Sequence, residues 1–247
     1  MRHTPAFEQH AHNGACSARR KSLFLFCLAP RFAALCALFV AMVSAVAAPN
    51  VLLEDTDVRI VLASVAPGQK SQPHHHTVNR VMIALDDGKM RLAFDDGKVV
   101  DREWKTGDVW WDTKGGTHTS ENMGGAAYRL IEVELKRPGG GAVAWPADDP
   151  VATSPAHFKV ELDNEQVRVM RLRLAPKEKT ALHSHQLPRM MVYLNAQQVR
   201  MTLANGRGST FRYKAGQVTR GGKARHAESN LGAGPLTTLF IELKPFL

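Results

Sequence analysis

The chain has 247 residues, and its 32 lysine and arginine residues against 23 aspartate and glutamate residues give a net charge of +9. Residues 1–48 hold five of the basic residues and one acidic residue, so residues 49–247 carry a net charge of only +5. Without a block of clustered lysine and arginine, this charge argues against a nucleic-acid-binding protein, and the 44% apolar and 22% charged composition excludes a disordered chain. The three cysteines, Cys16, Cys27 and Cys36, all lie within residues 1–48, so the rest of the chain has no disulfide and no cysteine metal site.

Residues 1–48 have the pattern of an export signal. A positive flank at residues 19–21 (Arg-Arg-Lys) precedes an apolar stretch, and residues 45–47 (Ala-Val-Ala) match a small-residue cleavage site. A membrane anchor is the alternative, but Pro30 and Arg31 break the apolar stretch, and the part after them, 33–48, is shorter than the span of about 20 residues that a membrane helix needs. We therefore expect cleavage near Ala47 or Ala48, export by the general secretory or twin-arginine route, and a periplasmic or secreted protein with no stable membrane anchor.

The mature chain contains two copies of one unit, which a search for internal repeats reveals. In the first part of the copies, matching positions differ by 109 in residue number, and in the rest they differ by 108. The first copy spans residues 49–137 and the second spans residues 157–247. A linker rich in glycine and proline, residues 138–156, separates them. The matching pairs include His74 and His183, His76 and His185, Arg80 and Arg189, His118 and His226, and Asn122 and Asn230.

Each copy predicts short β-strands joined by tight turns. In the first copy, Asp87-Gly88 and Asp96-Gly97 are dipeptides that favour hairpin turns, and Asn205-Gly206 is one in the second. Residues 167–174 alternate between apolar and polar with a period of two, as a strand does. No stretch after residue 50 has convincing helical periodicity, so each copy is predicted to form a small sandwich or barrel. Side chains expected to be structural are Asn122 and Asn230, which cap turns, and Trp104, Trp110 and Trp111, which pack in a core or an interface.

Six of the eight histidines beyond the leader occupy equivalent positions in the two copies. Residues two apart on a strand point to the same face, so His74 and His76 can direct two imidazoles to one point, while His75 points outward. His118, from a distant strand, would complete a set of three. Three neutral imidazoles suit iron(II), zinc, copper or nickel and leave positions open for substrate. The expected metal ligands are His74, His76 and His118 in the first copy, and His183, His185 and His226 in the second.

The spacing of these residues resembles the paired motifs of the cupin superfamily. Residues 68–76 read G-x5-H-x-H, and residues 107–122 read G-x5-T-x-G-x2-H-x3-N. The second copy repeats the histidines of this pattern, but it has Lys177 in place of the first glycine and one residue fewer before His226, so the first copy resembles an intact site more closely. The resemblance implies an all-β chain of two tandem jelly-roll (cupin) β-barrels, with a divalent metal ion for which iron is favoured and zinc, manganese, nickel and copper are alternatives. It also implies a spread of activities, namely dioxygenases, decarboxylases, isomerases and binding proteins without known catalysis. Pairing into a homodimer is expected from the resemblance alone.

Both copies depart from the superfamily at one position. Its first motif continues H-x-H-x3-E, with the glutamate as a fourth ligand, but here Arg80 and Arg189 stand in that place. A guanidinium about 6 Å from a dication is repelled by roughly 5 to 6 kcal/mol at an effective dielectric constant of about 20. Three arrangements relieve this repulsion. An anion bridges the metal and the arginine, Glu134 and Glu242 on the last strand of each copy neutralise the arginines, or the site holds no metal.

The first arrangement, in which an anion bridges the metal and the arginine, leads to the main hypothesis. The protein is an exported bicupin that acts on a small anionic organic molecule in a dioxygenase-like or decarboxylase-like reaction. Arg80 is its candidate catalytic residue, and Arg80 and Arg189 are its candidate substrate-binding residues, because a guanidinium can hold a carboxylate by two hydrogen bonds. For both arginines, an arginine–glutamate pair that closes the barrel wall is the structural alternative. A non-catalytic carboxylate-binding protein with vestigial metal sites is the alternative function, and a purely structural barrel is the third.

Overall fold

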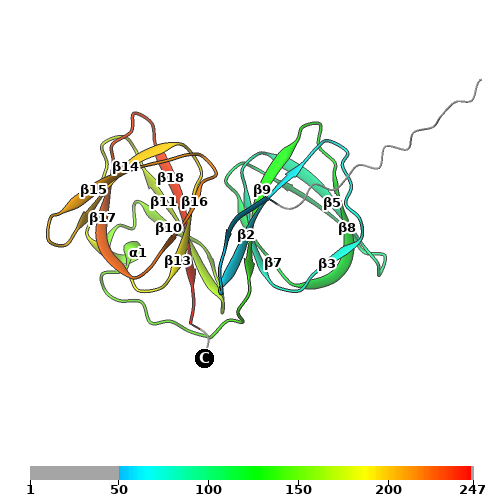
Figure 1. Ribbon diagram of the computed structural model, residues 1–247, viewed down its shortest axis with the longest axis horizontal. Helices are drawn as coiled ribbons and strands as arrows, with labels where there is room; N and C mark the ends of the chain where they lie inside the picture. Colours follow the sequence, from blue (N-terminus) through cyan, green and yellow to red (C-terminus); the bar gives the residue numbers. More distant parts are fainter. Residues whose placement is uncertain (1–49, 246–247) are drawn as a thin grey trace, which may run out of the picture. The chain divides into compact units, whose positions relative to one another are not determined.

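The computed structural model of the protein describes residues 50–245 (Figure 1), so the predicted leader, 1–48, lies outside the described residues. Just over half of these residues lie in β-strands, and the one helix among them is α1 (Pro150–Thr153). No helix within residues 50–245 is both long enough and apolar enough to span a membrane.

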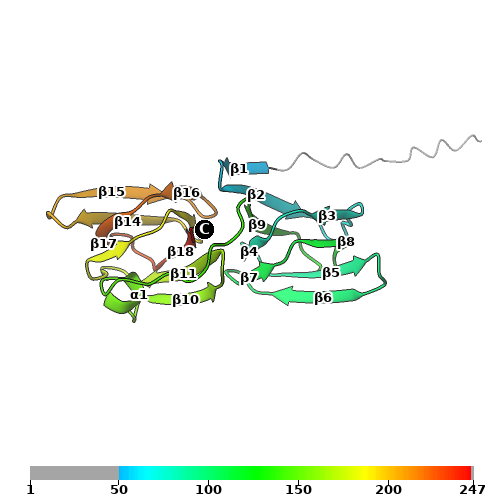
Figure 2. The ribbon, with the colours of Figure 1, turned by 90° about the horizontal axis from the view of Figure 1, so that it is seen from below.

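The first barrel consists of nine strands in two antiparallel sheets. One sheet has the order β1-β2-β9-β4-β7, and the other has the order β3-β8-β5-β6. The two sheets lie on opposite sides of the barrel interior (Figures 1 and 2). The strands are β1 (Asn50–Glu54), β2 (Val58–Val65), β3 (His74–His76), β4 (Arg80–Ala84), β5 (Gly88–Phe94), β6 (Val99–Trp104), β7 (Val109–Asp112), β8 (Gly115–Asn122) and β9 (Tyr128–Leu135).

The second barrel repeats this topology strand for strand. Its sheets have the orders β10-β11-β18-β13-β16 and β12-β17-β14-β15, in which each strand corresponds to the one numbered nine lower. The prediction of an all-β chain with two tandem jelly-roll barrels is therefore confirmed. The strands are β10 (Phe158–Asp163), β11 (Val167–Leu174), β12 (His183–His185), β13 (Arg189–Tyr193), β14 (Gln197–Leu203), β15 (Gly208–Tyr213), β16 (Val218–Gly221), β17 (Ala224–Asn230) and β18 (Leu236–Leu243).

Strand β11 shows how the sequence alternation builds two cores at once. Val167 and Val169 on one face belong to a hydrophobic cluster that also contains Val58 and Ile60 of the first barrel. Met170 and the residues two and four positions beyond it, on the other face, fill the interior of the second barrel. Because one face of the strand packs against the other barrel, the two barrels share a hydrophobic core.

Equivalent turns in the two barrels carry a residue in the left-handed conformation. Gly68 has a φ of 67°, and Lys177, at the matching position, has a φ of 69°. In this conformation, the Lys177 backbone N–H donates a hydrogen bond to the carbonyl of Asn230, as the Gly68 N–H does to the carbonyl of Asn122. Lys177 is the one non-glycine residue with positive φ among residues 50–245. A left-handed conformation costs a residue with a side chain about 1–2 kcal/mol.

Part of the predicted linker packs closely on the second barrel. We call residues 144–154 the inter-barrel segment. The Ser184 hydroxyl donates a hydrogen bond of 2.7 Å to Asp148, and Asp149 accepts one of 2.6 Å from Arg168. The ring of Trp145 lies 3.3 Å from the guanidinium of Arg168. The inter-barrel segment is therefore held against the strands β11 and β12.

Candidate metal centres

The first histidine set combines strands β3 and β8 of the first barrel. Antiparallel pairing places His74 opposite His118, and the ring centroids of these residues lie 4.6 Å apart. The His76 ring lies 5.0 Å from that of His74 and 5.4 Å from that of His118. One nitrogen from each ring lies within 4.8 Å of the others, and His75 between them is exposed. The three imidazoles are therefore close enough to hold one metal ion.

Backbone carbonyls orient two of these rings and set which ring nitrogen carries the hydrogen. The Nδ1 atom of His74 is 2.9 Å from the carbonyl oxygen of Gln72, and that of His118 is 3.0 Å from the carbonyl oxygen of Gly116. Because a carbonyl oxygen only accepts hydrogen bonds, Nδ1 carries the proton and the lone pair of Nε2 is free. This arrangement is the one that orients metal-binding histidines in proteins.

The second histidine set lies on strands β12 and β17 and is sealed from solvent. His183 pairs with His226 across the two strands. The relative exposure of His183, His185 and His226 is 0%, 1% and 0%. The Nδ1 atom of His183 bonds to the carbonyl of Ala181, and that of His185 bonds to Glu242, each at 2.9 Å. The Nε2 atoms of both rings are buried without a hydrogen-bond partner, and a bound metal ion would satisfy them.

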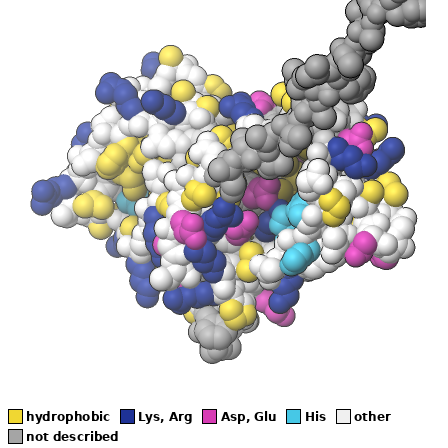
Figure 3. All heavy atoms as spheres, turned by 45° about the vertical axis from the view of Figure 1, so that its right-hand side comes forward, with side chains coloured by type: hydrophobic (Ala, Val, Ile, Leu, Met, Phe, Trp, Pro, Cys, Tyr) yellow, Lys and Arg dark blue, Asp and Glu magenta, His cyan; other side chains and the backbone are white. Residues whose placement is uncertain are grey.

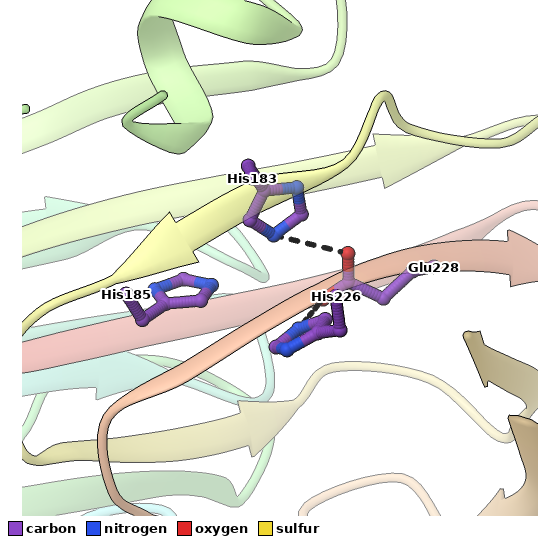
Figure 4. Close-up of side chains that lie close together, drawn as sticks. All are labelled: His183, His185, His226 and Glu228. Carbon is purple, nitrogen blue, oxygen red and sulfur yellow. Dashed lines mark hydrogen bonds and ion pairs between the residues drawn. The ribbon is translucent and has the colours of Figure 1, made fainter. Parts of the chain in front are cut away.

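A carboxylate that the sequence analysis missed, Glu228, joins this second set (Figure 4). Its Oε1 lies 2.9 Å from Nε2 of His226, and its Oε2 lies 3.3 Å from Nε2 of His183. Glu228 stands two residues after His226 on β17, so both side chains point to the same face. The spacing rule that pairs His183 with His185 would have found it. In the first barrel, Ser120 occupies the equivalent place.

Burial lowers the pKa of histidines in both sets. It lowers the pKa of His76 to about 3 and lowers that of His183 as well, because the interior disfavours a charged imidazolium. Burial by itself would raise the pKa of Glu228, but the hydrogen bond with His226 and the other imidazoles outweigh it and lower the pKa to about 2. Neutral imidazoles and an ionised carboxylate are the forms that bind metals.

Arg80 lies next to the first set and is already paired with acidic side chains. Its guanidinium donates hydrogen bonds to Glu132 and Asp112. The arrangement in which Glu134 neutralises Arg80 is not the one adopted, although the two residues stand opposite each other on β4 and β9. Glu134 is also opposite Arg59 on β2 and accepts a hydrogen bond of 3.0 Å from that residue instead. The structure therefore has the arginine–glutamate pair of the structural alternative, with a different glutamate.

Arg189, in the second barrel, has no such carboxylate partners. It donates a hydrogen bond to the carbonyl of Gly222, and its Nε is buried without a partner. The arrangement in which Glu242 pairs directly with Arg189 is not adopted either, because Glu242 binds Arg168 and His185. No carboxylate within residues 50–245 forms an ion pair with Arg189. Burial lowers the pKa of this arginine, and the charges of Glu228 and Glu242 act on it without direct contact.

The two sets open into cavities of different size. The first cavity, of about 130 Å³, is lined by the first histidine set together with Arg80, Trp110 and Glu132. The second, of about 50 Å³, is lined by Arg189, His226 and Glu228 among others. The exposed histidine side chains in Figure 3 lie beside acidic and basic ones on the face that the view brings forward. The first cavity has room for a small organic molecule, and it is smaller than the cavities that bind drug-sized ligands.

The remaining residues singled out in the sequence have structural places. Asn122 holds its turn through hydrogen bonds to the carbonyl of Val65 and from the N–H of Gly124, and Asn230 makes the equivalent bonds in the second barrel. Trp104 is buried in a core cluster of the first barrel, and Trp111 packs on the shared core. Trp110 packs against a core cluster of the first barrel, as expected, and it also lines the first cavity.

Comparisons with known proteins identify the fold. No protein-family model matches the sequence. No curated protein matches it either. A structure of a single-residue variant of oxalate decarboxylase from Bacillus subtilis is similar over 77% of this chain and 70% of its own, with a TM-score of 0.55 and 15% identity. A second structure of that enzyme, which concerns its Mn(II) centres, covers 78% and 70%, with a TM-score of 0.54 and 14% identity. AerE from Microcystis aeruginosa covers 80% and 97%, with a TM-score of 0.55 and 12% identity.

Proposed function

The chain has the two-barrel fold of the cupin superfamily, and on this premise we propose that it is a metal-dependent enzyme whose first barrel acts on a small carboxylate in a decarboxylase-like reaction. One observation carries the proposal. Three imidazoles converge beside a cavity that also holds a guanidinium and two carboxylates. Such a combination of metal ligands and proton-transfer groups in one cavity is the usual mark of a reaction centre.

The residues of the first set fit a divalent first-row metal. His74 and His118 have free Nε2 atoms because their Nδ1 protons are held by carbonyls, and His76 stays neutral far below neutral pH. Three imidazoles leave coordination positions for a substrate oxygen. When bound, the ion supplies Lewis-acid polarisation of a substrate carboxylate. We propose iron first, with manganese, zinc, nickel and copper as alternatives, since imidazole suits several of these ions.

Glu132 is the residue that can move a proton in this cavity. Decarboxylation breaks the bond between the departing CO2 and its neighbouring carbon, and the electron pair left on that carbon must take up a proton. Burial raises the pKa of Glu132 and outweighs the effect of Arg80 beside it, so the acid form persists to higher pH than in an exposed glutamate. The equivalent residue of the second barrel is Phe240, which cannot transfer a proton. We therefore assign the chemistry to the first barrel.

Arg80 has two roles in this proposal. Its hydrogen bonds to Glu132 and Asp112 hold the proton-transfer carboxylate in place. Its Nε is buried without a partner, so the remaining donor capacity of the guanidinium is available to an anionic substrate. The charge of Asp112 offsets part of the repulsion between the guanidinium and the metal ion.

The first test is elemental analysis of protein purified without a histidine tag, for the wild type, His74→Ala and His183→Ala. The expected result is one or two first-row metal ions per chain, with one lost in each variant whose set is occupied. Metal well below one ion per chain that added ions do not restore, unchanged by both substitutions, would contradict metal binding.

The second test is turnover of a panel of small mono- and dicarboxylates, with CO2 release followed with and without oxygen. Release that persists without oxygen and disappears in His76→Ala is the expected result. Consumption of oxygen would indicate a dioxygenase-like reaction instead. A non-catalytic carboxylate-binding protein is the second candidate, favoured by the unpaired guanidinium of Arg189. Under that function, calorimetry would detect carboxylate binding that survives His76→Ala, and no substrate would turn over.

We also propose export to the periplasm or the exterior, supported by the leader pattern of residues 1–48. Sequencing of the amino terminus of the mature protein should find a start near residue 48. A mature protein that begins at residue 1 would contradict the proposal.

A further inference from the structure

We infer that the second barrel retains its metal ion as a closed four-ligand centre completed by Glu228, and that this ion anchors the inter-barrel segment, whereas the first barrel exchanges its ion. The inference rests on the metal binding proposed above and adds a division between the two sites. It is carried by the ligand sets, by the burial of the second set and by the contacts that connect it to residues 144–154.

The ligand sets differ by one residue. One carboxylate oxygen of Glu228 and one nitrogen from each of the three histidines of the second set lie within 4.8 Å of one another. Thr180 orients this carboxylate, because its hydroxyl donates to Oε2 at 3.2 Å and accepts from the Glu228 N–H at 2.9 Å. Ser120 has the equivalent place in the first barrel, and no carboxylate joins the first set among the described residues. Four protein ligands are typical of retained structural ions, and three are typical of ions with an open position.

Access to the two sets also differs. His74 and His76 are half-buried and line the larger cavity. All four residues of the second set, whose side chains Figure 4 draws close together, are buried, and the cavity beside them is the smaller one. An ion in the second barrel can leave only when the surrounding structure opens, so its release is limited by the rate of that opening.

The inter-barrel segment seals the second set. Ser184 stands between His183 and His185, and both its hydroxyl and its N–H bond to Asp148 of the segment. In the first barrel, the equivalent residue is His75, which is exposed. The segment covers the outer side of the strand that carries two of the ligands.

A chain of buried ion pairs connects the segment to a ligand. Asp149 accepts a hydrogen bond from Arg168, Arg168 donates to Glu242, and Glu242 bonds to Nδ1 of His185. Every member of this chain is buried. A metal ion on Nε2 of His185 therefore favours the orientation that the segment also stabilises, and loss of the ion removes one end of the chain.

The experiment uses the mature protein loaded with two equivalents of Zn²⁺ and challenged with excess chelator, with released zinc followed over time. Two phases are expected. His74→Ala should remove the fast phase and His183→Ala the slow phase. Glu228→Gln, which keeps the size of the side chain, should accelerate the slow phase by about tenfold or more and leave the fast phase unchanged. Ser120→Glu is the matched variant, and it should slow the fast phase.

A slow phase that Glu228→Gln leaves within about twofold of the wild-type rate, or a single phase for both ions, would overturn the inference while metal binding stands. If His183→Ala binds as much zinc as the wild type, the metal proposed for the second barrel is itself wrong. Hydrogen exchange of residues 144–154 provides a measurement that does not depend on a variant. Protection of these amides should fall when the slow zinc leaves, and equal protection with and without that zinc would overturn the anchoring role.

Discussion

At the scale of single residues, duplication has left one copy with a strained turn. The backbone of both turns needs positive φ in order to donate its hydrogen bond, and only the first copy retains glycine there. Lys177 adopts the conformation because the flanking strands and the bond to Asn230 determine it. Lys177 is exposed, so the position is a candidate for stabilisation.

We expect Lys177→Gly to raise the free energy of unfolding by about 1 kcal/mol, measured by urea denaturation of the metal-free protein. Gly68→Ala is the matched control. It should lower stability, and it should do so through conformation alone, because no atom lies within 4 Å of an added Cβ at that residue. A decrease in stability for Lys177→Gly would show that the lysine side chain is needed.

The raised pKa of Glu132 should make the free energy of unfolding depend on pH. Its folded pKa is raised by burial above the ordinary value, so the folded protein holds the proton more tightly than the unfolded chain does. This contribution is fully present below the unfolded pKa and is lost as the pH rises through the folded pKa. Relative to Glu132→Gln, the metal-free wild type should therefore lose stability as the pH rises above about 4.5. Urea denaturation of both proteins between pH 4 and 8 measures this difference, and a constant difference would contradict the raised pKa.

At the scale of strands and the segments between them, the contribution of an ion pair to the free energy of unfolding depends on how deeply the pair is buried. The guanidinium of Arg168 is 3% exposed and lies between Asp149 and Glu242, which connect the inter-barrel segment to β11 and β18. Arg91 and Asp101 form an ion pair with two hydrogen bonds of 2.8 Å between β5 and β6, but their side chains are 43% and 42% exposed. Water solvates the second pair whether or not it forms, and it cannot reach the first.

Arg168→Met should therefore lower the free energy of unfolding by about 3 to 5 kcal/mol, because it leaves two buried carboxylates without a partner. Arg91→Met, the control, should cost less than about 1 kcal/mol. Chemical denaturation of both variants makes the comparison. Equal effects would mean that solvent reaches the Arg168 network.

At the scale of the whole described chain, the shared core makes the two barrels one folding unit. Fully buried residues of both barrels, among them Ile60, Val81, Val169 and Ile241, belong to a single cluster. Each barrel by itself would expose this apolar face to water, which is unfavourable in proportion to its area. Stability in either barrel therefore depends on the other.

Ile60→Ala removes a side chain from the first barrel's part of this core, and a loss of about 2 to 5 kcal/mol is expected. Calorimetry should show one unfolding transition in the wild type and one, at lower temperature, in the variant, because the second barrel loses its packing partner together with the first. Two separated transitions, with the second unchanged, would contradict a shared core.

The sequence by itself determined the two copies, their strands and the six histidines that the structure brings together in two sets. These are local properties: strand alternation and the spacing of two residues place side chains on one face whatever the rest of the fold does. The same rule applies to Glu228, which stands two residues after His226.

Only the tertiary structure decided which carboxylate pairs with which arginine. Glu134 lies opposite both Arg59 and Arg80, and competition between these neighbours assigns it to Arg59 and leaves Arg80 to Glu132. Such pairings depend on strand register and on side chains from distant parts of the chain, and no local pattern in the sequence specifies them.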